Sequence, residues 1–480
     1  MALGKHSQAM HFQARAGEKI RNPVLQAALQ KARPLFVGKR VKGIASLAED
    51  ALDFEQLRTA AKNIRNRTLA DLDVWLDIFE ARATASGAEV LWARDGAEVS
   101  RLVVDIARRH GVTKVAKSKS MLSEEAHLNE ALAEAGIRPV ETDLGEYIVQ
   151  LAGETPSHII APAVHKTIAE VEALFAKEHG RPLETRTSAD IPAMAREARA
   201  VLRQHFLSAE MGISGANFLI AETGSAALVT NEGNGRMVTT LPKIHVVITG
   251  IEKIVPTLED LATLMRLLPR SATGQSISNY VSLLTGTKRK GDQDGPEKTV
   301  FILVDNGRAN LLGSDYQDML RCIRCGACMN HCPVYFSLGG HAYGWVYPGP
   351  MGSVLTPLYT GLENALDLPH ASTGCNQCGS VCPVAIPLPD LMHRLREEQH
   401  ERGLRPWSER LALKAWAWIA GKPALYRWLA SRVVRYLNWL ADGSGRIQIL
   451  GLAPAWTAGR DLPVSSSRTF HELYSARKKP

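Results

Sequence analysis

The cysteines of this chain are confined to one short stretch. All seven lie between Cys322 and Cys382, and none precedes them. An odd number at such tight spacing does not suit a framework of disulfides. Clustered thiols are instead typical of metal ligands and of a reducing compartment. The cysteines therefore predict a metal centre, around which this part of the chain must fold.

The first cysteine motif ends in proline. It reads Cys322-Ile-Arg-Cys325-Gly-Ala-Cys328-Met-Asn-His-Cys332-Pro333, which is C-x2-C-x2-C-x3-C-P. Bacterial ferredoxins have this spacing, and there the fourth cysteine ligates the other of two iron–sulfur clusters. A zinc site can also use C-x2-C pairs. Four cysteines in this run, followed by proline, favour iron–sulfur clusters.

The second cysteine motif is one thiol short. It reads Cys375-Asn-Gln-Cys378-Gly-Ser-Val-Cys382-Pro383, and alignment of the two Cys-Pro pairs gives Ser372 the place of the first cysteine. The crossed ligation of two-cluster ferredoxins then predicts two ligand sets. The first set is Cys322, Cys325, Cys328 and Cys382; the second set is Cys332, Cys375 and Cys378.

The first set is complete for a [4Fe–4S] cluster, and the second lacks one ligand. The second cluster is therefore predicted to be [3Fe–4S], or [4Fe–4S] with a ligand other than cysteine. Ser372, a water or a small molecule could serve, although the Ser372 hydroxyl could equally cap a turn. No charged residue occurs from Met329 to Leu362, which predicts a wrap that keeps water from the clusters.

Residues 86–310 alternate between short apolar runs and helical segments. We expect helices over 99–110 and 123–135, and strands at 89–93, 113–116, 158–161, 218–221, 244–249 and 300–304. Such alternation predicts a mostly parallel α/β sheet covered on both faces. Ligands of such sheets bind at the carboxyl ends of the strands.

Polar loops follow several of these strands, at 117–120, 222–225 and 231–235. Gly and Asn are the residues of ordinary turns, and this interpretation competes with a shared ligand pocket. Lys117, Glu222 and Asn231 are the candidate pocket residues. The chain contains neither G-x-G-x-x-G nor G-x-x-x-x-G-K-[ST], so no NAD, flavin or P-loop motif is present.

The two ends of the chain are predicted to be helical. Apolar residues recur at three- and four-residue steps within residues 1–85, which predicts a helical platform for the α/β domain. Residues 401–480 form a basic, Trp-rich tail, with eight basic residues, one acidic residue and five Trp between Arg402 and Leu440. We favour packing on the protein itself or on a partner over contact with a membrane surface.

The net charge of +8 on 480 residues is modest and does not by itself identify a partner. The basic run 288–290 has acidic residues close behind it, which favours a solvated loop, and no nucleic-acid partner is expected. No apolar run of about 20 residues predicts a membrane span, and residues 1–20 lack an export signal. We expect a cytoplasmic protein, with peripheral contact at the inner face of the membrane as the alternative.

Together these residues resemble the LutB-type iron–sulfur subunits of the lactate utilisation system, in which a LUD domain precedes a ferredoxin-like module. The resemblance covers about residues 60–480, and that family shares the incomplete second motif. Besides the cysteines it rests on Lys117-Ser-Lys-Ser-Met121, Glu141-Thr-Asp-Leu-Gly-Glu146, His158-Ile-Ile-Ala-Pro162, Ser214-Gly-Ala-Asn217, Ala221-Glu-Thr-Gly224, Thr230-Asn-Glu-Gly-Asn234, Gly339-Gly-His-Ala-Tyr-Gly344 and Tyr347-Pro-Gly-Pro350.

The resemblance implies a LUD α/β domain over residues 86–310, related to the sugar-phosphate isomerase (NagB) and CoA-transferase-like proteins. A mainly helical two-cluster ferredoxin-like domain would follow over residues 311–400. The resemblance also implies that the chain is an electron-transfer subunit of a complex that oxidises L-lactate to pyruvate. The partners would be a cysteine-rich-domain subunit and a second LUD protein.

Other functions remain open at this point. The chain could itself be catalytic and bind lactate or a cofactor in the LUD pocket. It could carry electrons for another hydroxyacid dehydrogenase, or be an interaction scaffold with structural clusters. No catalytic residue transfers from the family.

Overall fold

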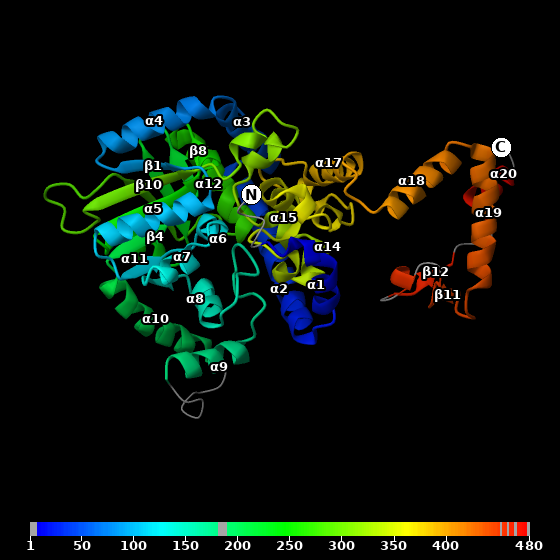
Figure 1. The fold of residues 1–480 in the computed structure, drawn as a ribbon, viewed down its shortest axis with the longest axis horizontal. Helices are drawn as coiled ribbons and strands as arrows, with labels where there is room; N and C mark the ends of the chain where they lie inside the picture. The colour runs from blue at the N-terminus through cyan, green and yellow to red at the C-terminus, as the bar shows by residue number, and fades with distance from the viewer. Residues whose placement is uncertain (1–6, 181–189, 452–453, 458–459, 465–467, 478–480) are drawn as a thin grey trace. The chain divides into compact units, whose positions relative to one another are not determined.

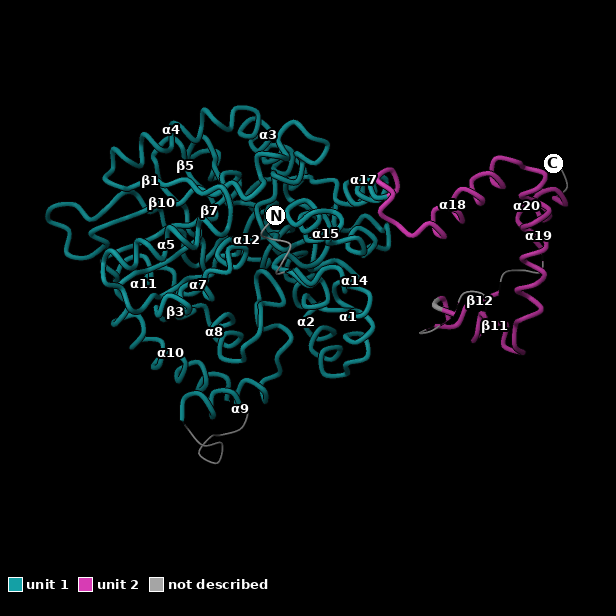
Figure 2. Tube along the Cα trace, in the orientation of Figure 1, with its two compact units in different colours: residues 1–399 teal, residues 400–480 magenta. Residues whose placement is uncertain are grey.

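The computed structural model describes residues 7–180, 190–451, 454–457, 460–464 and 468–477. The chain divides into two compact units, residues 1–399 and residues 400–480 (Figure 2). The first unit contains the two larger sheets and all seven cysteines. Each unit is described by itself.

A six-stranded sheet forms the centre of the first unit (Figure 1). Every pair of neighbouring strands in it is parallel. The order β1-β10-β7-β4-β2-β3 joins β1 (Glu89–Ala93), β10 (Lys298–Val304), β7 (Ile244–Gly250), β4 (Met211–Ser214), β2 (Lys114–Lys117) and β3 (Arg138–Glu141). The predicted parallel α/β fold class is confirmed.

Both faces of this sheet are buried, because successive side chains of a strand point to opposite faces. Val300 and Ile302 of β10 belong to the core under α5 (Gly96–Arg109) and α7 (Leu128–Glu134). Phe301 and Leu303 belong to the core on the other face, together with residues of α4 (Leu72–Ala85). One strand thus supplies both cores, which explains its continuous apolar run.

A second sheet has the order β8-β5-β6-β9. It consists of β8 (Ile254–Val255), β5 (Phe218–Ile220), β6 (Ser225–Thr230) and β9 (Tyr280–Thr285). Strand β6 pairs antiparallel with both of its neighbours. The predicted strand 218–221 therefore belongs to this sheet and not to the parallel one.

The strand predicted at 158–161 is wrong. His158 is buried there, and its Nδ1 accepts hydrogen bonds from the backbone N–H groups of Ile160 (2.9 Å) and Ala161 (3.1 Å). A side chain that takes two successive backbone donors favours a turn over a strand ladder. The apolar sequence Ile-Ile-Ala carries no sign of this.

The helix predicted over 123–135 is interrupted. His127 has φ 51° in the left-handed region, between α6 (Met121–Glu125) and α7. The remaining helices of the α/β part are α8 (Leu144–Leu151), α9 (Ile168–Glu178), α10 (Ile191–Ser208), α11 (Asn234–Thr240) and α12 (Leu258–Ala272).

The N-terminal helices α1 (Phe12–Lys19), α2 (Pro23–Ala45) and α3 (Phe54–Ala70) contact the cysteine region, and α2 and α3 also contact the α/β part. The Gln26 side chain donates to the Ser337 carbonyl (2.8 Å), and Arg40 donates to the Val381 carbonyl (3.0 Å). Arg58 donates to the carbonyl of Cys382 itself (2.8 Å). These helices therefore help to enclose the cysteine motifs.

The cysteine region is mainly helical, as predicted. Three of its α-helices have only four to six residues, and 3-10 turns join several of the helices. They are α13 (Ala327–Asn330), α14 (Pro333–Leu338), α15 (Gly349–Thr360), α16 (Gln377–Ser380) and α17 (Leu388–Glu401). Nearly all of α15 is buried, in agreement with its lack of charged residues.

The second unit contains α18 (Trp407–Ala420), α19 (Pro423–Trp439) and α20 (Phe470–Ser475), with the two-stranded β11–β12 (Arg446–Ile447 and Leu462–Pro463). Neither α18 nor α19 has a buried residue. Trp407 and Trp439 are 75% and 78% exposed. Over the described part of the chain, every helix is too short or too polar to cross a bilayer.

Candidate metal centre and adjoining cavity

The two cysteine motifs share one backbone conformation. Arg324 (φ 58°) and Gly326 (φ 74°) of the first motif correspond to Gly374 (φ 71°) and Asn376 (φ 58°) of the second. A four-residue helix, α13 or α16, follows each pair. Glycine adopts this left-handed region freely, and asparagine tolerates it. The repeat agrees with the alignment of the two Cys-Pro pairs.

The four thiols of the first predicted set are buried or half-buried and influence one another's ionisation; they are Cys322, Cys325, Cys328 and Cys382. Burial, followed by Cys382 and Cys322, raises the pKa of the Cys325 thiol to about 12. Burial and its thiol neighbours raise the pKa of Cys328 well above its usual value. Backbone N–H groups donate to sulfur at Cys322 (from Arg324, 3.5 Å) and at Cys382 (from Ile386, 3.4 Å).

The other three thiols line one small cavity together with Ser372. Burial and Cys332 raise the pKa of Cys378 to about 12. Cys375 is exposed, and a hydrogen bond with the Thr373 side chain lowers its pKa. The Ser372 hydroxyl accepts a hydrogen bond from the Gly374 N–H (3.1 Å), so it caps a turn and also lies on the cavity wall.

These surroundings fit iron–sulfur clusters. Soft thiolates are the ligands that such clusters require, and the crowded thiols disfavour one another's ionisation without a cation between them. N–H groups directed at sulfur tune cluster potentials. Cys328 also lies within electrostatic reach of Cys378, so the two groups of thiols adjoin.

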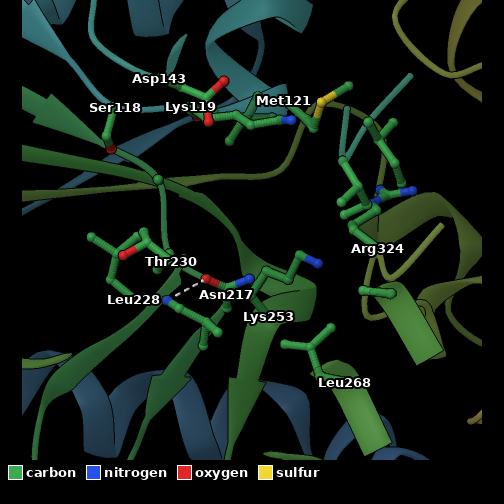
Figure 3. A pocket seen from close by; sticks show the side chains of 18 of the residues that line it. Ser118, Lys119, Met121, Asp143, Asn217, Leu228, Thr230, Lys253, Leu268 and Arg324 are labelled. Atoms are coloured by element: carbon green, nitrogen blue, oxygen red, sulfur yellow. Dashed lines mark hydrogen bonds between the residues drawn. The ribbon is translucent and has the colours of Figure 1, made fainter. Parts of the chain in front are cut away.

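A cavity of about 470 Å³ lies between the parallel sheet and the first cysteine motif (Figure 3). Its walls come from the carboxyl ends of β2, β4 and β7, and from Arg324 and Tyr347 of the cysteine region. Strand β3 lies on one side of β2, and β4, the next strand of this sheet along the chain, lies on the other side. The order in which the chain adds strands to the sheet therefore reverses at β2. The carboxyl edge of such a switch point is the usual ligand site of an open α/β sheet.

A buried charge network forms one side of this cavity. Arg308 donates to Glu252 (2.7 Å) and Glu125 (2.8 Å), and Arg324 lies 3.5 Å from Glu252. Burial alone would raise the pKa of Glu252, but Arg308, Lys253 and Arg324 outweigh it and lower this pKa to about 2. Burial and Arg324 lower the pKa of Lys253 to about 8.

The three predicted pocket residues have different surroundings. Asn231 lines the cavity, and its amide donates to Gln275 (2.9 Å). Lys117 is not among the lining residues; it is fully buried and pairs with Glu141 (2.6 Å). Glu222 is also absent from the lining, and it accepts the backbone N–H of Leu258 at the start of α12 (2.9 Å).

Sequence reasoning missed the cations that do line the cavity: Lys119, Lys253, Arg308 and Arg324. Lys119 lies in the loop that directly follows β2, two residues after Lys117 at the end of that strand, so the polar loop itself was the available signal. Lys253 and Arg324 carry no local signal, because they reach the cavity from segments far apart in the chain.

Comparisons with known proteins cover almost the whole chain. Residues 76–304 match the LUD domain family, residues 318–386 match the 4Fe-4S dicluster domain, and residues 393–479 match the family "Lactate utilisation protein B, C-terminal". A solved structure of a DUF162 family protein from Deinococcus radiodurans aligns with 49% of this chain and 98% of its own, at 16% identity and a TM-score of 0.26.

Several curated relatives are similar over nearly their full length. "Lactate utilization protein B" of Lysinibacillus sphaericus is 41% identical over 98% of this chain and 97% of its own, and that of Bacillus subtilis is 39% identical over 97% and 96%. "Uncharacterized electron transport protein YkgF" of Escherichia coli is 39% identical over 96% of both chains. The chain therefore belongs to the lactate utilization protein B family.

Proposed function

We propose that this chain is the iron–sulfur electron-transfer subunit of a complex that oxidises L-lactate to pyruvate. The observation that carries the proposal is the pair of adjoining thiol groups enclosed by helices. Membership of the family supports a role in lactate utilisation and in electron transport, since relatives bear the names lactate utilization protein B and electron transport protein.

The stoichiometry of the reaction suits two centres. Oxidation of lactate to pyruvate releases two electrons and two protons, and each bound cluster would exchange one electron at a time. Cys322, Cys325, Cys328 and Cys382 would hold one cluster, and Cys332, Cys375 and Cys378 the other, with Ser372 as a candidate fourth ligand. Helices α13 and α15 exclude water from the first site, since most of their residues are buried.

The exposure of Cys375 suggests where electrons enter or leave. This thiol is exposed, whereas Cys332 and Cys378 of the same set are buried. A partner that docks at residues 372–377 would come close to the second centre without disturbing the first.

The function is tested by reduction of the anaerobically purified chain. We expect iron and sulfide in the preparation, reversible reduction by dithionite, and no reduction by lactate alone. Reduction by lactate without partners would favour the catalytic alternative. Clusters that cannot be reduced reversibly would contradict electron transfer and favour a structural role.

The ligand sets are tested by the variant Cys332→Ala. The second cluster should be lost and the first retained, as measured by iron counting and electron paramagnetic resonance. Ser380→Ala, at an exposed position within the second motif that offers no thiol, is the matched control and should keep both clusters. Loss of only the first cluster's signal would contradict the crossed assignment.

We further propose that the partners are a cysteine-rich-domain subunit and a second LUD protein. The exposed Trp residues and the basic charge of α18 and α19 support a docking role for this unit. Co-purification of the full chain with both partners tests it. Binding to anionic vesicles in place of the partners would favour the membrane alternative.

A further inference from the structure

The cavity between the sheet and the first cysteine motif contains polar atoms that the protein does not pair. Ser118 and Thr249 are 1% and 2% exposed, and both line it. Over the described chain, Ser118 Oγ, Thr249 Oγ1 and the buried Lys119 Nζ find no hydrogen-bond partner. Buried polar groups in proteins are normally satisfied, so three unpaired polar groups on residues that line one cavity point to a polar ligand that completes their hydrogen bonding.

The donors in the cavity select a negatively charged ligand. Figure 3 shows Lys119 and Lys253 on opposite sides of the space, and Asn217 also lines it. The Asn217 oxygen is already used, since it accepts the Val229 N–H (2.8 Å). The hydrogen bond that Lys253 makes to the Cys322 carbonyl is long, at 3.4 Å.

The carboxylates of the same cavity are, by contrast, committed to protein partners. Glu252 is held by Arg308 and Arg324. Asp143 accepts the Glu146 N–H (3.1 Å), and Glu232 accepts the Leu144 N–H (3.2 Å). The available groups are therefore two ammonium ions with amide and hydroxyl donors, which suit an anion.

The size of the cavity indicates how large this anion is. A volume of about 470 Å³ lies in the range of sites for drug-sized and cofactor-sized ligands, and lactate has only six heavy atoms. Ammonium groups on two opposite walls favour a ligand with more than one anionic group. We propose that this cavity binds an organic polyanion whose carboxylate or phosphate groups pair with Lys119 and Lys253.

Two residues of the cavity lining, Lys253 and Arg324, also contact the first cysteine set. Lys253 donates to the Cys322 carbonyl, and the Arg324 N–H donates to the Cys322 sulfur (3.5 Å). A bound anion adds negative charge beside the site that would gain an electron. This second step rests on the proposed function: the anion lowers the reduction potential of the first cluster, and by linkage the reduced protein binds the anion more weakly by the same factor.

Binding is tested by calorimetry on the full anaerobic chain, with citrate and pyrophosphate as probes and lactate as the small monoanion. We expect saturable binding of citrate or pyrophosphate, and the stronger probe separates carboxylate from phosphate as the preferred group. Lys119→Met and Lys253→Met should each weaken binding at least tenfold. Lys290→Met, in the exposed loop after β9, should leave it unchanged.

Asn217→Asp is a further variant, because an aspartate keeps an acceptor for the Val229 N–H while placing negative charge in the cavity. It too should weaken binding tenfold or more without changing the melting temperature by more than a few degrees. Binding that none of the three cavity variants weakens, or the absence of binding by both polyanions, overturns the proposal. Binding of lactate in preference to both also overturns it.

A redox titration with and without the bound probe separates this inference from the proposed function. A lower potential of the first cluster in the presence of the probe supports the coupling, and an unchanged potential despite lysine-dependent binding overturns the coupling. Reversible clusters without polyanion binding overturn the inference and leave the electron-transfer function standing. Lysine-dependent binding of the polyanion to a chain whose clusters cannot be reduced would support the binding site and contradict the electron-transfer function.

Discussion

Arg308 connects the α/β part of the first unit to the cysteine region. Its side chain is 2% exposed, and its guanidinium forms ion pairs with both Glu125 and Glu252. The Tyr347 hydroxyl donates to the same Glu125. Removal of one member of a buried charge network leaves the others uncompensated, which costs more free energy than the intact network contributes.

The variant Arg308→Met should lower the free energy of unfolding by about 3–5 kcal/mol, because the buried Glu125 and Glu252 would each lose the ion pair with Arg308, and Glu252 would keep only the longer contact with Arg324. Urea unfolding followed by circular dichroism measures this. The control is Arg94→Met, whose side chain is 90% exposed and pairs with Glu98; it should cost less than about 1 kcal/mol. Equal effects of the two variants would contradict the role of Arg308.

Glu124 gives the stability a pH dependence. Burial raises the pKa of this carboxyl to about 7, although Lys117 lies 3.9 Å away and opposes the shift. Because the folded pKa exceeds the unfolded value, the contribution of Glu124 is fully present below its ordinary pKa and is lost as pH rises through about 7.

Glu124→Gln should therefore stabilise the protein at pH 8 relative to wild type, by about 1 kcal/mol or more, and much less at pH 5. Melting temperatures at the two pH values measure the difference. A variant with the same pH dependence as wild type would show that Glu124 ionises normally in the folded chain.

At the scale of elements, the backbone of β4 fits closely against α11. A Cβ added to Gly212 would overlap the carbonyl oxygen of Val238, and Gly212 does not have positive φ. The glycine is thus required by close packing of a helix on a strand and not by backbone conformation. Its position also matters for the cavity, since β4 leads directly into the loop 215–217.

Gly212→Ala should destabilise the protein by about 1–3 kcal/mol, because the strand or the helix must move. The control is Gly38→Ala in α2, where an added Cβ meets no atom within 4 Å; it should be neutral or stabilise by up to about 1 kcal/mol. Denaturant midpoints measure both changes. A neutral Gly212→Ala variant would mean that the contact relaxes freely.

Elements with simple periodicity were the ones that sequence predicted well. Segments near β1, β2, β7 and β10 carry apolar runs, and the structure has strands there. Strands β3 (Arg138–Glu141) and β4 (Met211–Ser214) were missed because β3 contains Pro139 and β4 contains Gly212, two residue types that are depleted in strands. The false strand at 158–161 arose because a buried histidine, and not a neighbouring strand, binds the backbone.

At the scale of the whole molecule, the division at residue 399 separates the cysteines from the basic tail. The first unit contains all seven thiols and the helices that contact them. The family match over residues 393–479 covers the second unit. The two units are therefore expected to have separable roles.

A chain ending at Gln399 should keep the iron content and the visible spectrum of the full protein, because its cysteine surroundings are complete. It should lose association with partner subunits, measured by co-purification. The full chain is the control. A truncated chain that folds but holds less than about half the iron would show that the tail stabilises the clusters.

The sequence by itself determined the cysteine chemistry, the family and the α/β class, because ligand spacing and periodicity are properties of neighbouring residues. Only the tertiary structure decided that Ser372 shares a cavity wall with Cys332, Cys375 and Cys378, and that Lys119, Lys253 and Arg324 surround one space. It also decided that Lys117 and Glu222 serve other contacts. These contacts join residues that lie in different helices, strands and loops, and the burial and charge around each residue arise only when the chain packs.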